Sequence, residues 1–171
     1  QTADVAMAKS LLEEVSREVQ SNGWHFNREY DVSLASDASD NIVIPTNAAR
    51  VDVEPSNARG MDYIQRGSKL YNKSDSTYII NDAKKCTIIY LLDWDDLPES
   101  ARQYVMIRAA RKFQDRVVGS EKHHSFTTMD EMHALIALRS AEADNADFTI
   151  FDNYDVYRVI DRGSVINKVT S

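Results

Sequence analysis

The sequence contains few of the residues that build covalent or metal-based scaffolds. Its 171 residues include one cysteine, Cys86, three prolines and five glycines. A single cysteine excludes an internal disulfide framework and a cysteine-based zinc site. Five glycines are few for phosphate-binding loops, and neither G-x-x-x-x-G-K-[ST] nor G-x-G-x-x-G occurs. The NTPase and dinucleotide-binding classes are therefore excluded.

Long hydrophobic runs are also absent. No apolar stretch approaches the roughly 20 residues that cross a bilayer. The opening, QTADVAMAKSLLEEV, lacks the basic start and apolar core of a secretory signal. We therefore expect synthesis in a reducing cytoplasm. Because the chain does not begin with Met, we also expect that residues before Gln1 are missing.

Positive charge is in deficit. There are 20 Lys and Arg residues against 27 Asp and Glu residues, which gives a net charge of −7. Phosphate binding needs clustered cations, so a surface that grips nucleic acid is not expected. The hydrophobic fraction of 43% and the charged fraction of 27% are typical of one globular domain of this length.

The first 22 residues predict an amphipathic helix. Asn22-Gly23 supplies its end, since glycine tolerates the left-handed conformation that follows a helix. Apolar residues recur at three- and four-residue steps, and we expect the following to be buried: Val5, Ala8, Leu12, Val15 and Val19.

From Trp24 to Asp96 the apolar period changes to two, which predicts strands. Gly67-Ser68 has the composition of a two-residue hairpin turn. Strands separated by such turn-forming residues favour a small antiparallel sandwich or barrel. The predicted strands are 32–35, 42–45, 50–54, 61–66, 69–72, 77–80 and 86–92.

Two further helices are predicted, each from a capping box. Asp96 and Glu99 begin the first, and Thr128 and Glu131 begin the second, which runs to about Asn145. The expected buried residues of the first are Leu97, Ala101, Val105, Ala109, Phe113 and Val117. Those of the second are Met132, Leu135, Ile136 and Ala143.

Beyond Ala146 no sustained period remains, although the segment is too apolar for a disordered tail. We interpret it as an extended arm that buries its large side chains against another surface, such as a second subunit. The predicted fold class is α+β. It comprises a helical bundle (1–24 and 97–145), an inserted small antiparallel β region (25–96) and a C-terminal arm (146–171).

Clustered carboxylates between the β region and the next helix have two interpretations. Asp93, Asp95 and Glu99, with Trp94 as a platform for a sugar ring, are the candidates for a glycoside hydrolase site, which needs two carboxyl groups about 5–10 Å apart. The same acids also favour the positive end of a helix dipole and act as caps. We prefer the second interpretation, in which the segment is a strand-to-helix junction.

Cations are concentrated on the helix that follows. They lie within one arc of about 120° at 100° per residue, which fits a salt-bridged subunit interface better than a DNA-binding helix. The candidate interface cations are Arg102, Arg108, Lys112 and Arg116. Aromatic residues of the arm are candidates for the same role: Phe148, Phe151, Tyr154 and Tyr157.

The histidines do not have the spacing of a zinc site. His123 and His124 are expected in a surface loop, with His133 in the next helix, and no H-E-x-x-H pattern is present. We therefore expect neither a metal nor a cofactor.

Two segments resemble a known family. RGSKLYN (66–72) and DLPESARQYVMIRAARKFQDRVVGSE (96–121) are similar to tail tubular protein A of short-tailed podophages, and the resemblance runs over nearly the whole chain. It implies a head-to-tail adaptor, or gatekeeper, in the virion. Members of this family form a dodecameric ring between the portal protein and the nozzle, tail tubular protein B, with tail fibres attached nearby. DNA leaves the head through the lumen of the ring without specific binding.

The leading hypothesis is therefore a non-enzymatic structural protein of the virion tail. The alternative is a tail protein with a second activity, the hydrolysis of host surface polysaccharide. DNA binding through the arginine-rich helix is a third and weaker reading.

Overall fold

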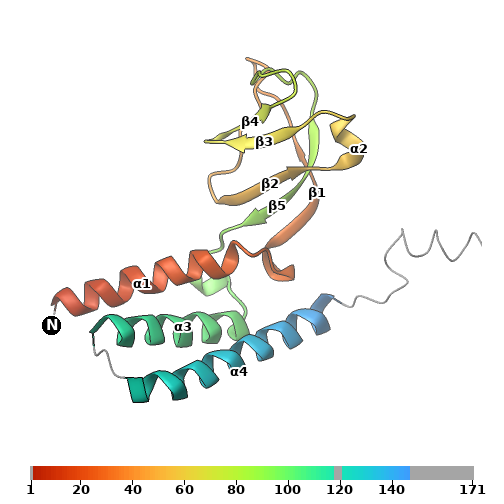
Figure 1. Cartoon of the computed structure of the whole chain (residues 1–171). Coiled ribbons are helices and arrows are strands. Elements are labelled where there is room, and N and C mark those ends of the chain that lie inside the picture. Colours follow the sequence, from red (N-terminus) through yellow and green to blue (C-terminus); the bar gives the residue numbers. More distant parts are fainter. Residues whose placement is uncertain (1, 118–120, 147–171) are drawn as a thin grey trace, which may run out of the picture.

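Three long helices lie side by side at one end of the molecule, and a group of short strands lies at the other (Figure 1). The computed structural model describes residues 2–117 and 121–146. Within them the chain forms a helix, then the strands, then two more helices. The fold is α+β, as predicted.

The helical bundle consists of α1 (Thr2–Gln20), α3 (Glu99–Val117) and α4 (Glu121–Ala146). α3 lies between the other two and packs against both (Figure 1). Of the stripe predicted for this helix, Ala101, Val105 and Ala109 are buried and Phe113 is half-buried, and Tyr104, which was not predicted, is buried with them. The core of the bundle is made by Val15, Val19, Leu97, Ala101, Tyr104, Val105, Ala109 and Leu138.

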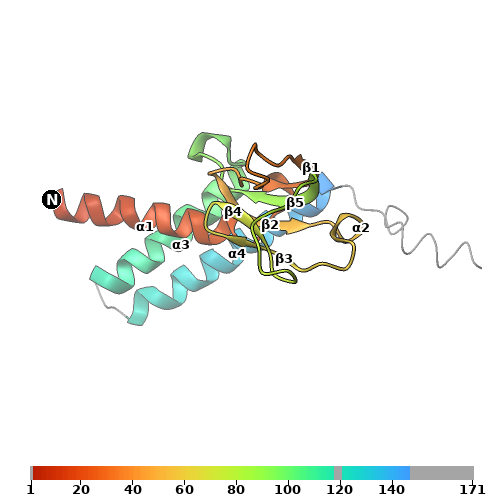
Figure 2. The ribbon, with the colours of Figure 1, turned by 90° about the horizontal axis from the view of Figure 1, so that it is seen from above.

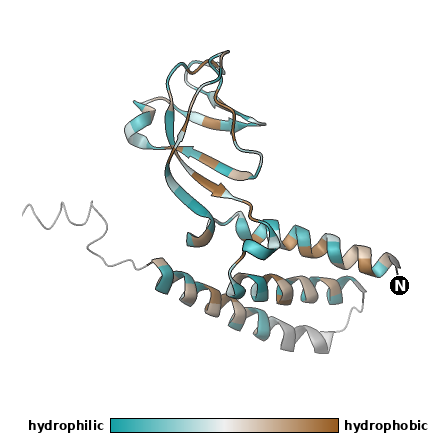
Figure 3. Cartoon of the chain, turned by 180° about the vertical axis from the view of Figure 1, so that it is seen from behind, coloured by the Kyte–Doolittle hydropathy of each residue, from teal (hydrophilic) through white to brown (hydrophobic). Residues whose placement is uncertain are grey.

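The β region contains two antiparallel sheets. In the larger, the central strand β5 (Lys84–Tyr90) lies between β1 (Arg28–Leu34) and β2 (Ala48–Val53), and the end of β5 nearest the helices is brown in Figure 3. The smaller is the hairpin of β3 (Tyr63–Arg66) and β4 (Lys69–Asn72). Three short helical turns complete the described chain: η1 (His25–Asn27), α2 (Pro55–Ala58) and η2 (Trp94–Asp96).

The predicted hairpin turn is confirmed. Arg66 pairs with Lys69, which leaves Gly67 and Ser68 as the two turn residues. Gly67 has a φ of 62°, in the region where glycine is favoured. Because such a turn fixes the register, alternate residues of β4 enter the core beside Ile42 and Ile80.

A buried polar junction joins the helices to the sheet. The side chain of Gln20, at the end of α1, donates to the carbonyl of Leu92 (3.2 Å) and accepts from its N–H (2.7 Å). Asn27 donates to the carbonyls of Gln20 (2.9 Å) and Tyr90 (2.7 Å). The two places where the chain crosses between bundle and sheet are therefore held together by paired backbone groups.

Two predicted strands are wrong. In 42–45, Ile42 and Val43 form only isolated bridges, and in 77–80 only Thr77 does so. Both segments are rich in β-branched or aromatic residues, which favour strands, but neither forms a continuous ladder with a partner strand. In contrast, β1 begins four residues earlier than predicted, because Arg28 and Glu29 pair with Ile89 and Ile88.

Both predicted capping boxes are also wrong. Asp96 belongs to η2, and the carbonyl of Pro98 accepts the first hydrogen bonds of α3. Thr128 and Glu131 lie inside α4, which begins at Glu121. As a result, His123 and His124 are in a helix rather than in the predicted loop.

The expected buried stripes are only partly correct. Val15 and Val19 are buried, but Val5 and Ala8 are exposed, because the N-terminal end of α1 lies apart from the neighbouring ends of α3 and α4 (Figure 2). Among the α4 side chains from 128 on, Leu138 is buried and the predicted Leu135 is half-buried against the core, whereas the predicted Met132, Ile136 and Ala143 are exposed. The arm, 147–171, lies outside the described residues.

Candidate interface on the helical bundle

Arg108 of α3 lies between carboxylates of both neighbouring helices. Its Nη1 is 2.8 Å from an Oε1 of Glu131 on α4, and its Nη2 pairs with Glu18 on α1. Arg111 also pairs with Glu131. The side chain of Glu131 is only 12% exposed, and its charge is matched by two guanidinium groups. This cluster fixes the lateral order of the three helices.

The other predicted interface cations also have partners in this chain. Lys112 lies 2.7 Å from Glu18, and Arg116 lies 3.8 Å from Glu14. Arg102 pairs with Glu99 at 2.9 Å, three residues away on α3. The structure thus brings Arg108, Lys112 and Arg116 together along the seam with α1. Arg102 stands apart from that seam.

The charges in this seam alter one another's ionisation. The hydrogen bond from Lys112 lowers the pKa of Glu18, against the opposing effect of burial, and Arg108 lowers it further. Burial lowers the pKa of Arg108, but the hydrogen bond to Glu18 and the nearby Tyr104 outweigh it and raise the pKa overall. Both groups are therefore held in their charged forms.

The carboxylates of the junction segment do not form one site. Asp93, Asp95 and Glu99 are all exposed. Asp93 and Trp94 line a pocket of about 630 Å³ between α1 and the segment before α3, but Asp95 and Glu99 do not line it. Trp94 also packs against the core of the bundle, so one of its faces is already covered.

Sequence reasoning missed two residues that shape this pocket. Glu13 and Gln20 of α1 line it together with Asp93 and Trp94 of the junction segment. The sequence marks Glu13 only as a charged residue of an amphipathic helix, and no local pattern assigns it to a pocket. Nothing in the sequence paired Gln20 with Leu92, because that contact spans 72 residues.

Among the described residues, no group of three or more His, Cys, Asp or Glu side chains converges as metal ligands would. The described helices also include none that is long and apolar enough to cross a membrane. The aromatic interface candidates, Phe148, Phe151, Tyr154 and Tyr157, lie outside the described residues.

Comparison with protein families decides the identity of the fold. A family model described as "Tail tubular protein" matches residues 1–148. The chain belongs to the tail tubular protein family. The match spans all three helices of the bundle and the whole β region, so the ion-paired seam is part of a tail tubular protein fold. A search of curated proteins finds no match.

Membership in the tail tubular protein family establishes the general role of the chain. It is a structural component of a phage tail and belongs to the assembled virion tail. The resemblance of 66–72 and 96–121, on which the sequence-based prediction depended, falls within the matched residues.

Proposed function

We propose that this tail tubular protein is a head-to-tail adaptor. Copies of the chain form a ring, dodecameric by the family resemblance, between the portal protein and the nozzle protein, with tail fibres attached near the junction. The protein is made in the host cytoplasm and joins the particle there. The observation that carries the proposal is the family match over residues 1–148.

The charge of the chain is consistent with a channel for DNA. A net charge of −7 per copy, repeated around a ring, produces a negative potential near the lumen. Phosphates are repelled by such a surface, so DNA slides through rather than binding. Arg108 and Lys112 of α3 pair with glutamates of the same chain, so they offer little free positive charge to DNA.

The parts of the chain have separate roles in this proposal. The bundle (1–24 and 97–145) gives a rigid ring segment, and the β region (25–96) extends from it as a distinct unit. The arm (146–171) docks on the portal or on a neighbouring copy through its aromatic residues. Arg102 and Arg116 contribute to subunit contacts, with Arg116 keeping about half of its side chain exposed.

Electron microscopy of portal assemblies mixed with this protein tests the proposal. The full chain is expected to add a ring to the portal, and a chain that ends at Ala146 is expected to lose that binding. Portal assemblies that stay bare with the full chain contradict the adaptor role. Equal binding by the truncated chain contradicts the role of the arm alone.

A second candidate function rests on the 630 Å³ pocket. Glu13 and Asp93 both line it, with Trp94 beside them, so two carboxylates and an aromatic ring face one cavity. This is the residue set of a glycoside hydrolase acting on host surface polysaccharide. Release of reducing sugar from capsule or α-glucan is the measurement. Activity that survives both Glu13→Gln and Asp93→Asn excludes this site.

A further inference from the structure

The N-terminal half of α1 carries an apolar stripe that nothing in the described structure covers. The stripe enters the bundle at Leu11, which is 1% exposed, and continues through Val15 and Val19. In the opposite direction the same face continues through Ala8 to Val5, which is 69% exposed. Figure 3 shows apolar residues recurring along α1 toward its N-terminus. The bundle therefore covers only half of the stripe.

A second uncovered face lies on α4. Met129, Met132 and Ile136 are 61%, 59% and 57% exposed and follow one another at three- and four-residue steps. They lie on the side of α4 opposite Leu138, which faces the core. Because α4 is apolar on both sides, it has the composition of a helix covered on both sides. We call Met129, Met132 and Ile136 the outer row.

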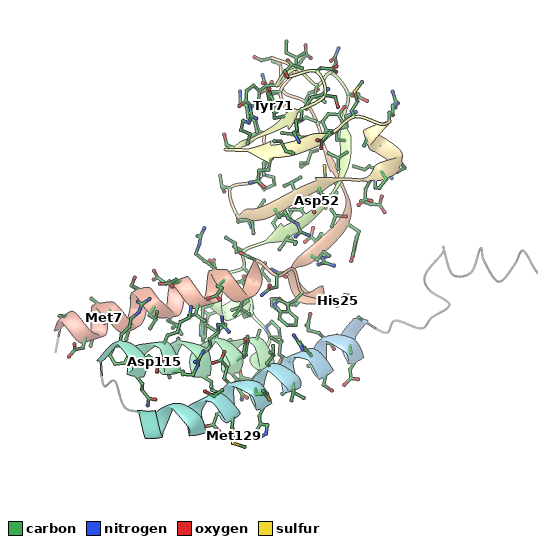
Figure 4. The ribbon with its side chains drawn as sticks, in the orientation of Figure 1. Met7, His25, Asp52, Tyr71, Asp115 and Met129 are labelled. Carbon is green, nitrogen blue, oxygen red and sulfur yellow. The ribbon has the colours of Figure 1, made fainter. Side chains whose placement is uncertain are left out.

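These two faces cannot meet within one molecule. Figure 4 labels Met7 on α1 and Met129 on α4, and α3 lies between the two helices. Resting on the proposed ring, we propose that the N-terminal half of α1 in one copy packs antiparallel on the outer row of α4 in the next copy. Such a contact joins two different faces, and repeated heterologous contacts close into rings.

The two faces match in length. The uncovered part of α1, residues 3–10, and the outer row, residues 129–136, each contain eight residues, or about 12 Å of helix. Beside the outer row lies a groove of about 540 Å³ between α3 and α4, which is lined by Gln103, Ile107, Ala110, Asp130, His133, Ala134 and Ala137. Its three alanines leave room for a side chain from the neighbouring helix.

The flanking charges complement each other only in the antiparallel orientation. On α1, Asp4 and Lys9 lie on opposite flanks of the uncovered stripe, and on α4, Asp130 and Arg139 lie on opposite flanks of the outer row. Antiparallel packing places Asp4 beside Arg139, and the same packing places Lys9 beside Asp130. None of these four residues has an ion-pair partner among the residues that the structure describes.

A second copy explains both faces with one contact. A partner that covered only the outer row would leave the stripe on α1 exposed, and the reverse also holds. Large exposed apolar patches are uncommon on proteins that function alone. The same chain carries both complementary surfaces, so copies can add to one another without a further component.

Charge reversal tests the contact in the full-length chain by sedimentation velocity over a range of concentrations. Asp4→Arg alone and Arg139→Asp alone each place like charges together and are expected to weaken self-association by about tenfold. The double variant restores the pairing and is expected to recover most of the association. If the single variants associated weakly because they failed to fold, combining the two substitutions would not restore association.

A matched pair of isoleucine substitutions tests the apolar part. Ile136→Glu, in the outer row, is expected to abolish association. Ile79→Glu is the control, because Ile79 has a similar exposure (59%) but lies in the β region. If both variants self-associate as strongly as the wild-type chain does, the proposed contact is overturned.

Disulfide trapping reports the direction of the contact. A chain with both Val5→Cys and Ile136→Cys is expected to give a ladder of covalent multimers under mild oxidation. Each single variant is expected to give no product larger than a dimer, and a mixture of the two gives a mixed dimer. Cys86 is buried and does not interfere. A double variant that yields only monomers contradicts the contact.

The outcomes separate the contact from the ring itself. If the wild-type chain associates but none of these substitutions alters it, the ring stands and the α1–α4 contact is wrong. If the wild-type chain stays monomeric at every concentration and no multimers can be trapped, both the contact and self-assembly into a ring are contradicted.

Discussion

Cys86 illustrates how a single side chain reports on the whole β region. Its thiol is fully buried in β5, and burial, with Glu54 and Asp52 nearby, raises its pKa to about 11. Reaction with thiol reagents requires the thiolate and access. At mildly alkaline pH the native protein is therefore expected to react only as fast as it unfolds. A Ser39→Cys chain has a second, exposed thiol and should react with one equivalent of the thiol reagent at once. Rapid reaction of Cys86 in the native wild-type chain contradicts its burial.

Gln20 is the residue whose loss should cost most at the junction. Replacement by Leu keeps the volume but leaves the N–H and carbonyl of Leu92 without their partner. Each unpaired buried backbone group costs roughly 1–3 kcal/mol. Gln103→Leu, on an exposed face of α3, is the control. Measured with urea, the decrease in the free energy of unfolding caused by Gln20→Leu should be several times the decrease caused by the control. Equal losses in the two variants mean that the junction is not a buried clamp.

At the scale of elements, the sequence predicted what depends on local pattern and missed what depends on distant contacts. The periods of α1 and α3 and the Gly67-Ser68 turn were sufficient to locate those elements. The start of α4 was missed because Thr128 and Glu131 match a capping box, although Glu131 in fact pairs with Arg108 and Arg111. A glutamate carboxylate can accept a hydrogen bond from a backbone N–H or from a guanidinium group, and the sequence alone does not show which of the two it binds.

Burial on α4 was missed for a related reason. A helix with apolar residues on two faces has no single period that marks the core side, so Ile136 was predicted to be buried and Leu138 was missed. Arg108, Lys112 and Arg116 pair with glutamates of α1 in the same chain, whereas Arg102 pairs within α3. The sequence does not give these pairings, because they depend on how the two helices lie in space.

Two glycines with similar backbone angles should respond differently to the same substitution. Gly23 and Gly67 have φ values of 73° and 62°, so Ala is strained at both by about 1 kcal/mol. A Cβ at Gly67 meets nothing within 4 Å, whereas at Gly23 it would lie 2.3 Å from Cδ1 of the buried Ile89. Overpacking adds roughly 1–3 kcal/mol. Thermal unfolding should show Gly23→Ala to be clearly the less stable; equal melting temperatures contradict this packing.

At the scale of the whole molecule, the α1–α3 seam should make stability depend on acid. The pKa of Glu18 is lowered below its ordinary value of 4.5. A carboxyl group whose pKa is lowered on folding stabilises the protein at pH values above its pKa in the unfolded state. That stabilisation is lost as the pH falls through its pKa in the folded state. Because Glu18 is partly exposed, the effect is small, below about 1 kcal/mol.

Urea unfolding from about pH 6 to about pH 3 measures this dependence. The wild-type chain should lose more stability over that range than Glu18→Gln, which lacks the titrating group. Glu13 is on the same helix and has no ion pair among the described residues, so Glu13→Gln should lose as much stability over this pH range as the wild-type chain does. If Glu18→Gln also loses as much stability as the wild-type chain, the seam does not contribute to the pH dependence.

The double hydrogen bond between Gln20 and Leu92 has a consequence for how the molecule moves. The chain leaves the bundle beside Gln20 and returns at Leu92, so any swing of the β region separates these two points. The N–H of Leu92 can exchange with solvent hydrogen only when they separate. The exchange rate of this one amide is therefore a gauge of the angle between the two halves. Its slowing on incorporation into a tail would record the moment at which that angle becomes fixed.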